Sequence, residues 1–68
     1  MSISITLNGE AKHIAPGTRL ATVIAELSLA DRRYAIERNG EIVPKSAAAT
    51  TELVNGDRLE VVVAVGGG

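Results

Sequence analysis

The chain has 68 residues, which is close to the lower size limit for a domain that folds on its own, so we expect a single domain. Hydrophobic residues make up 46% of it and charged residues 22%, a composition typical of globular proteins. The formal net charge is −1, with 7 basic residues dispersed among 8 acidic ones, so nothing marks a nucleic-acid-binding surface. Cysteine is absent, which excludes disulfides, thiolate nucleophiles and thiolate metal sites.

The sequence also lacks the signals of a membrane or exported protein. No apolar run approaches the roughly 20 residues that cross a bilayer, and residues 1–7 lack the basic start and long apolar stretch of a signal peptide. We therefore expect a cytoplasmic protein that makes no contact with a membrane.

The first elements are predicted to form a β-hairpin. Apolar and polar residues alternate over residues 2–7, the pattern of a strand with one buried face. Asn8 and Gly9 then favour the positive φ angles of a tight turn, and residues 10–15 return as a second strand.

A helix is predicted after Pro16 and Gly17, with Thr18 as its N-cap. Four apolar residues follow at the i, i+3, i+4 and i+7 positions of one helical face: Leu20, Val23, Ile24 and Leu27. This stripe indicates a core-facing helix.

The second half of the chain predicts further strands. Residues 34–38 read as a strand, and residues 41–43 as a short peripheral one that ends before Pro44. Residues 46–53 form a loop with at most one helical turn, and residues 58–65 are the longest strand. The expected fold class is α+β, a mixed ββαββ sheet with one helix packed on one face.

The last strand is apolar on both of its faces, which favours a central position in the sheet. Leu59, Val61 and Val63 are predicted to face the helix. On the open face we predict a docking spot for a partner protein, made of Glu60, Val62 and Ala64. The alternative is that these are ordinary exposed residues, because single apolar side chains on a surface are common.

No residue pattern indicates catalysis or metal binding by the chain itself. His13 is the only histidine, and we expect it to be solvated on a hairpin strand. The isolated turn glycines form no phosphate-binding loop. We also expect solvent to surround all eight carboxylates: Glu10, Glu26, Asp31, Glu37, Glu41, Glu52, Asp57 and Glu60.

The remaining distinctive group is the terminal carboxylate on a run of glycines, Gly66, Gly67 and Gly68. If each position is glycine with a probability of about 7%, roughly a few chains in ten thousand would end in three glycines by chance. The expected organisation is a folded domain over residues 1–65 and a flexible tail over residues 66–68 that reaches about 10 Å when extended. The alternative is a frayed end without function.

Several segments together resemble the thiamine-biosynthesis sulfur carriers of the ThiS family, and the resemblance covers nearly the whole chain. Each segment is weak evidence alone, but their order, spacing and position make the match specific. The segments are Asn39-Gly40-Glu41-Ile42-Val43-Pro44-Lys45, Thr51-Glu52-Leu53, Asn55-Gly56-Asp57-Arg58-Leu59-Glu60-Val61 and Val65-Gly66-Gly67-Gly68.

The resemblance implies a ubiquitin-like β-grasp fold and a role as a co-substrate without catalytic residues. An ATP-using adenylyltransferase, ThiF-like and related to E1 enzymes, is expected to adenylate Gly68. A sulfur-donating enzyme then supplies sulfur for a thiocarboxylate, which a ThiG-like thiazole synthase consumes. Gly66, Gly67 and Gly68 are implied to enter the partners' active sites. The chain itself is expected to bind no cofactor and to be monomeric when free.

Three alternatives remain at this stage. The small subunit of molybdopterin synthase shares the implied fold, tail and activation chemistry, but it is usually longer. A protein modifier conjugated to lysines and a plain β-grasp interaction module are the other two. The scarcity of aromatic residues, with Tyr34 alone, departs from many carriers and predicts a purely aliphatic core.

Overall fold

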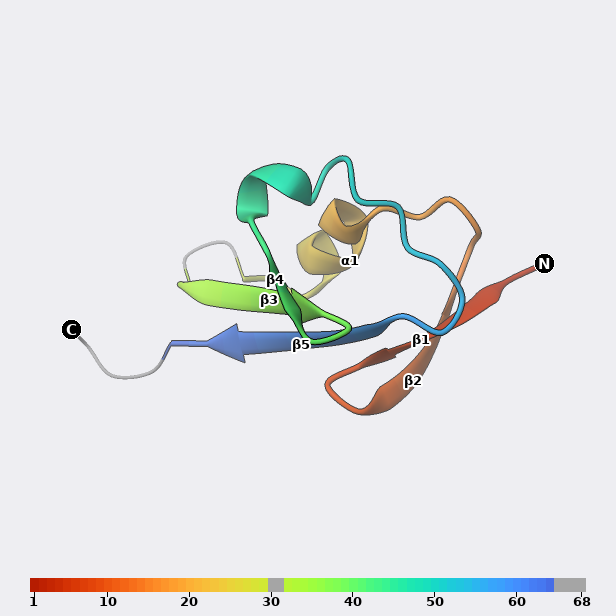
Figure 1. The fold of residues 1–68 in the computed structure, drawn as a ribbon, viewed down its shortest axis with the longest axis horizontal. Coiled ribbons are helices and arrows are strands. Elements are labelled where there is room, and N and C mark those ends of the chain that lie inside the picture. The colour runs from red at the N-terminus through yellow and green to blue at the C-terminus, as the bar shows by residue number, and fades with distance from the viewer. Residues whose placement is uncertain (30–31, 65–68) are drawn as a thin grey trace.

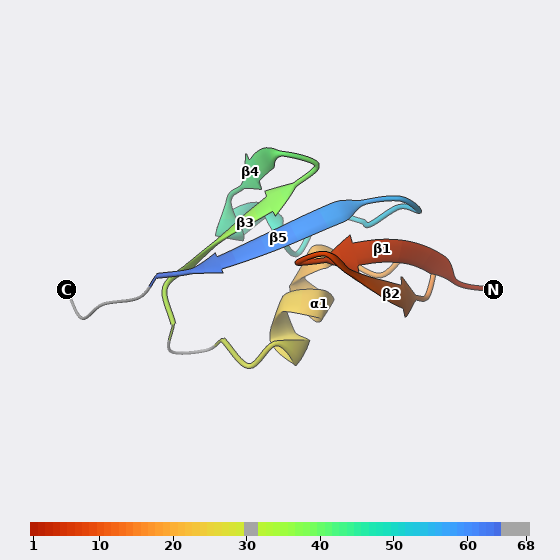
Figure 2. The same cartoon turned by 90° about the horizontal axis from the view of Figure 1, so that it is seen from below.

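The computed structural model describes residues 1–29 and 32–64, and the predicted glycine tail lies outside the described residues. Its described part forms one mixed sheet of 5 strands in the order β2-β1-β5-β3-β4, with α1 on one face (Figures 1 and 2). The elements are β1 (Ile3–Leu7), β2 (Glu10–Ile14), α1 (Leu20–Glu26), β3 (Tyr34–Arg38), β4 (Glu41–Val43), the 3-10 turn η1 (Lys45–Ala47) and β5 (Arg58–Val63).

The predicted fold class is confirmed, and β5 takes the predicted central place in the sheet. It pairs parallel with β1 and antiparallel with β3, while β1–β2 and β3–β4 are antiparallel hairpins. β4 is short and lies at an edge, as its position before Pro44 predicts. Three strands follow α1, namely β3, β4 and β5. The predicted ββαββ pattern has only two strands after the helix, because it leaves out β4, which is a full member of the sheet.

Two strand ends differ from the prediction. β2 ends at Ile14, one residue early, and β5 ends at Val63 although the apolar run continues. Hydrophobic pattern marks where a strand can lie, whereas the pairing partner decides where it ends. β3 begins at Tyr34, which pairs with Val63, so no further residue of β3 remains to extend the ladder.

The core is aliphatic and lies between the sheet and α1. Seven side chains are buried there: Ile5, Leu20, Val23, Ile36, Ala48, Leu53 and Leu59. The predicted helical stripe is confirmed, with Leu20 and Val23 buried and Ile24 half-buried against them. Ala48 and Leu53 come from the long connection between η1 and β5, so this segment closes the core over α1 (Figure 1).

The predicted N-cap of α1 is wrong. The Thr18 hydroxyl donates to the Ala15 carbonyl at 2.7 Å, and no side chain caps the helix. The first helical N–H groups find acceptors in the long connection instead, where the Leu20 N–H donates to the Thr51 carbonyl at 2.8 Å. A backbone segment distant in sequence thus replaces the local cap.

One predicted surface carboxylate, Asp57, is buried and only 2% exposed. It accepts from Arg38 Nε at 3.0 Å, from Asn39 Nδ2 at 3.1 Å and from the Val54 N–H at 2.9 Å. Burial by itself would raise the pKa of Asp57, but these bonds and the Arg38 charge outweigh it and hold the pKa below its usual value. The carboxylate therefore joins the end of β3 to the start of β5.

Two turn asparagines also hold β5. Asn8 and Asn39 adopt positive φ angles of 51° and 52°, as their turns require. The Asn8 Oδ1 accepts from the Val61 N–H at 2.8 Å, and the Asn39 Oδ1 accepts from the Arg58 N–H at 2.9 Å. Each hairpin turn is thereby tied to the central strand.

We predict that Asp57→Ala lowers the free energy of unfolding by about 2 to 4 kcal/mol at neutral pH. The substitution leaves the Arg38 guanidinium, the Asn39 amide and the Val54 N–H without their acceptor. Urea unfolding followed by circular dichroism measures the loss. Glu52→Ala, which removes an exposed carboxylate, is the control and should change little.

The same interaction predicts a pH dependence. Because the pKa of Asp57 is lowered by folding, its contribution is complete above the unfolded-state pKa of about 3.9 and is lost as pH falls through the lower folded-state value. The stability difference between the wild type and Asp57→Asn should therefore shrink below about pH 4. A difference that stays constant down to the acid unfolding of the protein would contradict this account.

Candidate functional site

β5 carries the chain toward the predicted tail. Its last pair with β3 joins Tyr34 and Val63, and the Ala64 N–H then donates to the Arg33 carbonyl at 2.8 Å. The backbone is therefore held by hydrogen bonds as far as Ala64, four positions before Gly68. Gly66, Gly67 and Gly68 lie outside the described residues, so their entry into partner active sites stays a prediction.

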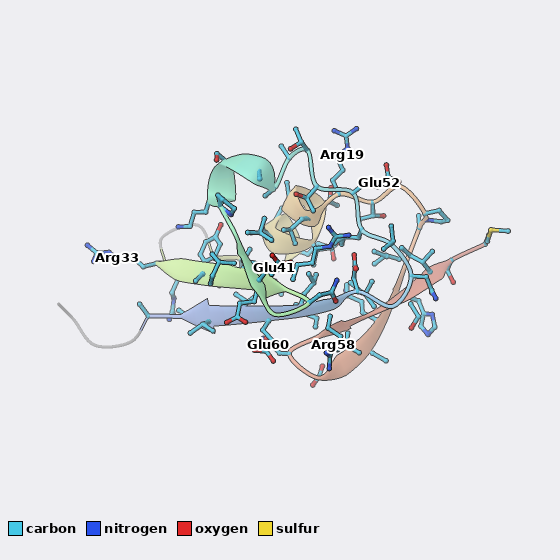
Figure 3. The ribbon with its side chains drawn as sticks, viewed as in Figure 1. Arg19, Arg33, Glu41, Glu52, Arg58 and Glu60 are labelled. Carbon is cyan, nitrogen blue, oxygen red and sulfur yellow. The ribbon has the colours of Figure 1, made fainter. Side chains whose placement is uncertain are left out.

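The alternation of side chains along β5 is as predicted. Leu59 is buried and Val61 packs against the core, whereas Val62 is 54% exposed and Glu60 is exposed. Figure 3 shows Glu60 on the side of β5 that faces away from α1. Ala64, beyond the end of the strand, is also exposed. The predicted facing is confirmed, and the docking role of these residues stays a prediction.

Register adds residues to this open face that the sequence analysis did not include. Ala35 lies opposite Val62, and Glu37 lies opposite both Glu60 on β5 and Ile42 on β4. Ile42 is 63% exposed. The hairpin turn at residues 39–40 could have identified Ile42 as the neighbour of Glu37, because the turn length sets the register of β3 with β4. No local signal sets the register of β3 with β5.

A concavity lies elsewhere in the described part of the chain, between the end of α1, β3 and η1. It measures about 390 Å³ and is lined mainly by Ile24, Leu29, Tyr34 and Lys45. The Lys45 Nζ lies 4.1 Å from the centroid of the Tyr34 ring, which is a cation–π contact. Among the described residues, the lining contains two cations, Arg32 and Lys45, and no carboxylate, so these residues do not indicate acid–base catalysis.

His13 lies exposed on the edge strand β2, as predicted. Over residues 1–29 and 32–64, no three histidine, cysteine or carboxylate side chains gather as the ligands of a metal ion. No helix in this part of the chain is long and apolar enough to cross a membrane.

The chain matches the model of the ThiS family over residues 5–68. It is 38% identical over 66 residues to a thiazole synthase of Paramagnetospirillum magneticum, covering 97% of this chain and 20% of that protein. The chain thus spans about a fifth of the length of the thiazole synthases it matches. It is also 34% identical over 67 residues to the uncharacterized protein ycf40 of Pyropia yezoensis, covering 98% of this chain and 94% of that protein.

The structural comparison agrees. The crystal structure of the thiamine biosynthesis protein ThiS from Geobacter metallireducens superimposes with a TM-score of 0.80 at 26% identity, covering 97% of this chain and 100% of that one. The mixed sheet with one helix is therefore the ubiquitin-like β-grasp fold implied by the sequence resemblance. The family match over nearly the whole chain and the shared fold establish that the chain belongs to the ThiS family.

Proposed function

We propose that this chain is a sulfur carrier for the synthesis of the thiazole of thiamine, and that it serves as a co-substrate of partner enzymes. The observation that carries the proposal is the family match, which runs through residue 68 and so includes the three terminal glycines. The similar ThiS of Geobacter metallireducens is named as a thiamine biosynthesis protein, which supports the thiamine pathway over molybdopterin synthesis.

The reacting group is the carboxylate of Gly68. One of its oxygens attacks the α-phosphorus of ATP on an adenylyltransferase, and pyrophosphate leaves. Hydrosulfide (HS⁻) supplied by a sulfur-donating enzyme then attacks the carbonyl carbon of the adenylate, expels AMP and loses its proton, which leaves a thiocarboxylate. Activation is needed because a free carboxylate is a weak electrophile, whereas an acyl-adenylate has a good leaving group.

Gly66 and Gly67 deliver this group to the partners. Glycine lacks a Cβ atom, so the backbone passes through a channel that would exclude other residues. Ordering such a tail costs roughly 1 to 2 kcal/mol per residue, which the docking of the folded domain offsets. The absence of cysteine from the sequence leaves no internal thiol to attack the activated terminus.

Thiazole synthase is the proposed recipient of the sulfur. In Paramagnetospirillum magneticum a segment similar to this chain forms part of a protein named thiazole synthase, which supports a functional connection between the two. The open face of the sheet is the proposed docking surface, because Glu60, Val62 and Ala64 are exposed there and lead directly into the tail.

We predict that deletion of Gly68, or of Gly67 and Gly68, abolishes thiazole formation in a reconstituted mixture with adenylyltransferase, sulfur donor and thiazole synthase. The thermal unfolding midpoint should stay unchanged, because the core residues all lie between Ile5 and Leu59. A deletion at the other terminus, of Met1 alone, is the matched control and should keep full activity. Product formation by either tail-deleted chain would refute the carrier proposal.

We also predict that Val62→Lys weakens adenylyltransferase binding roughly tenfold or more, because it places a charge on the apolar part of the docking face. Stability should fall by no more than about 1 kcal/mol, since the side chain is 54% exposed. Val54→Lys is the matched control: Val54 is 51% exposed but precedes β5 at the end opposite the tail. If the two variants bind the adenylyltransferase with equal affinity, Val62 is not part of the docking surface.

A further inference from the structure

The concavity on the α1 side of the sheet is positively charged, and we call it the basic hollow. Its lining includes the guanidinium of Arg32 and the ammonium of Lys45, which are both exposed, and the apolar side chains of Ile24 and Leu29. Within the described part of the chain, the ion pairs involve neither of these cations. The basic hollow therefore suits an anion that enters beside apolar side chains.

The basic hollow lies next to the place where the described chain ends. Tyr34, whose ring is in contact with the Lys45 ammonium, pairs with Val63 at the end of β5. The Ala64 N–H then donates to the carbonyl of Arg33, the residue between the two strands' last pair and the hollow's guanidinium. Figure 2 shows this end of β5 beside the start of β3. The tail therefore begins at the wall of the hollow.

The rest of the chain is long enough to enter the basic hollow. Residues 65–68 follow Ala64, and four residues span at most about 14 Å. Neighbouring strands lie about 5 Å apart, so this length exceeds the separation of β5 from β3 more than twofold. Gly66, Gly67 and Gly68 can adopt the positive φ angles of a chain reversal without steric cost. The carboxylate of Gly68 is an anion at neutral pH.

We propose that the carboxylate of Gly68 folds back into the basic hollow and pairs with Arg32 and Lys45, which gives the carrier a closed state that its partners must open. This inference rests on the proposed function, in which that carboxylate is free before activation. Attachment to the same chain gives the carboxylate an effective concentration in the millimolar range, which favours it over dilute anions from solution. Because exposed ion pairs are individually weak, the closed and open states are both populated.

The closed state predicts a gain of activity when the hollow loses its charge. Only the open fraction of the carrier can deliver its tail to a partner, so closure lowers the apparent affinity by that fraction. The variant Arg32→Gln/Lys45→Gln should therefore raise kcat/KM for adenylation of the carrier by about two- to fivefold. ATP–pyrophosphate exchange by the adenylyltransferase from the same organism measures this value.

Nuclear magnetic resonance of the isotope-labelled full chain tests the contact itself. The backbone amide shifts of Leu29 and Lys45 should differ between the wild type and a chain that lacks residues 66–68, whereas the shift of Glu37 on the open face should not. Addition of about 0.5 M NaCl should move the wild-type shifts toward those of the shortened chain at the same salt concentration, because salt screens an exposed ion pair.

The double variant and a matched control identify the cations responsible. In Arg32→Gln/Lys45→Gln, deletion of the tail should no longer change the Leu29 shift. Arg58→Gln is the control, because Arg58 is also an exposed cation but lies at the start of β5, at the end of the strand opposite the tail (Figure 3). In this variant, deletion of the tail should still change the Leu29 shift.

Three outcomes overturn the inference while leaving the sulfur-carrier proposal intact. The first is that tail deletion leaves the Leu29 and Lys45 shifts unchanged, and the second is that it still changes them in the double variant. The third is a kcat/KM for adenylation that is unchanged or lower in the double variant; a lower value would assign the two cations to an acidic surface of the partner. If the wild-type chain is not adenylated at all while tail deletion changes the shifts, the proposed function fails and the closed state stands.

Discussion

The central position of β5 is the constraint on which the rest of the structure depends. It pairs parallel with β1 and antiparallel with β3, and so joins the two hairpins into one sheet. Asp57 secures its start, where the buried carboxylate accepts hydrogen bonds from Arg38, Asn39 and the Val54 N–H. Because an unpaired buried charge is costly, the folded position of the strand requires these partners to be in contact with the Asp57 carboxylate. The direction in which the chain leaves the sheet follows from that placement.

Side chains alternate along β5, so that one set of residues stabilises the core and the other set is available to bind a partner. Leu59 and Val61 contribute to the core, and Glu60 and Val62 face outward. A change on the outward positions can therefore alter binding without removing core contacts. The charge of Glu60 illustrates the cost of such a surface, because it lies opposite Glu37 in a position that sheet stability alone would not favour. Proteins often tolerate local destabilisation of this kind at functional sites.

Sequence patterns predicted those features that depend on local periodicity. The alternation of apolar and polar residues over β1 and β5 predicted that these segments are strands. It also predicted which side of the sheet faces the core and that Val62 faces away from it. The resemblance of several segments to known sulfur carriers predicted the family. The errors share one cause, which is a partner distant in the sequence. Thr18 satisfies the local pattern of an N-cap, but the acceptor for the helix is the Thr51 carbonyl. Asp57 satisfies the pattern of a solvated turn residue, but Arg38 makes its burial favourable. Likewise, the pairing of Glu37 with Glu60 follows only from the register of β3 with β5.

The central claim is that sulfur is carried on the carboxylate of Gly68. Intact-mass spectrometry of the chain, after incubation with its adenylyltransferase, ATP and a sulfur-donating enzyme, tests it most directly. The account predicts the mass increase of one oxygen-to-sulfur replacement, located by fragmentation at Gly68 and absent when ATP is omitted. An unchanged mass while the adenylyltransferase consumes ATP in the presence of the chain, or sulfur located at any other residue, would contradict the account.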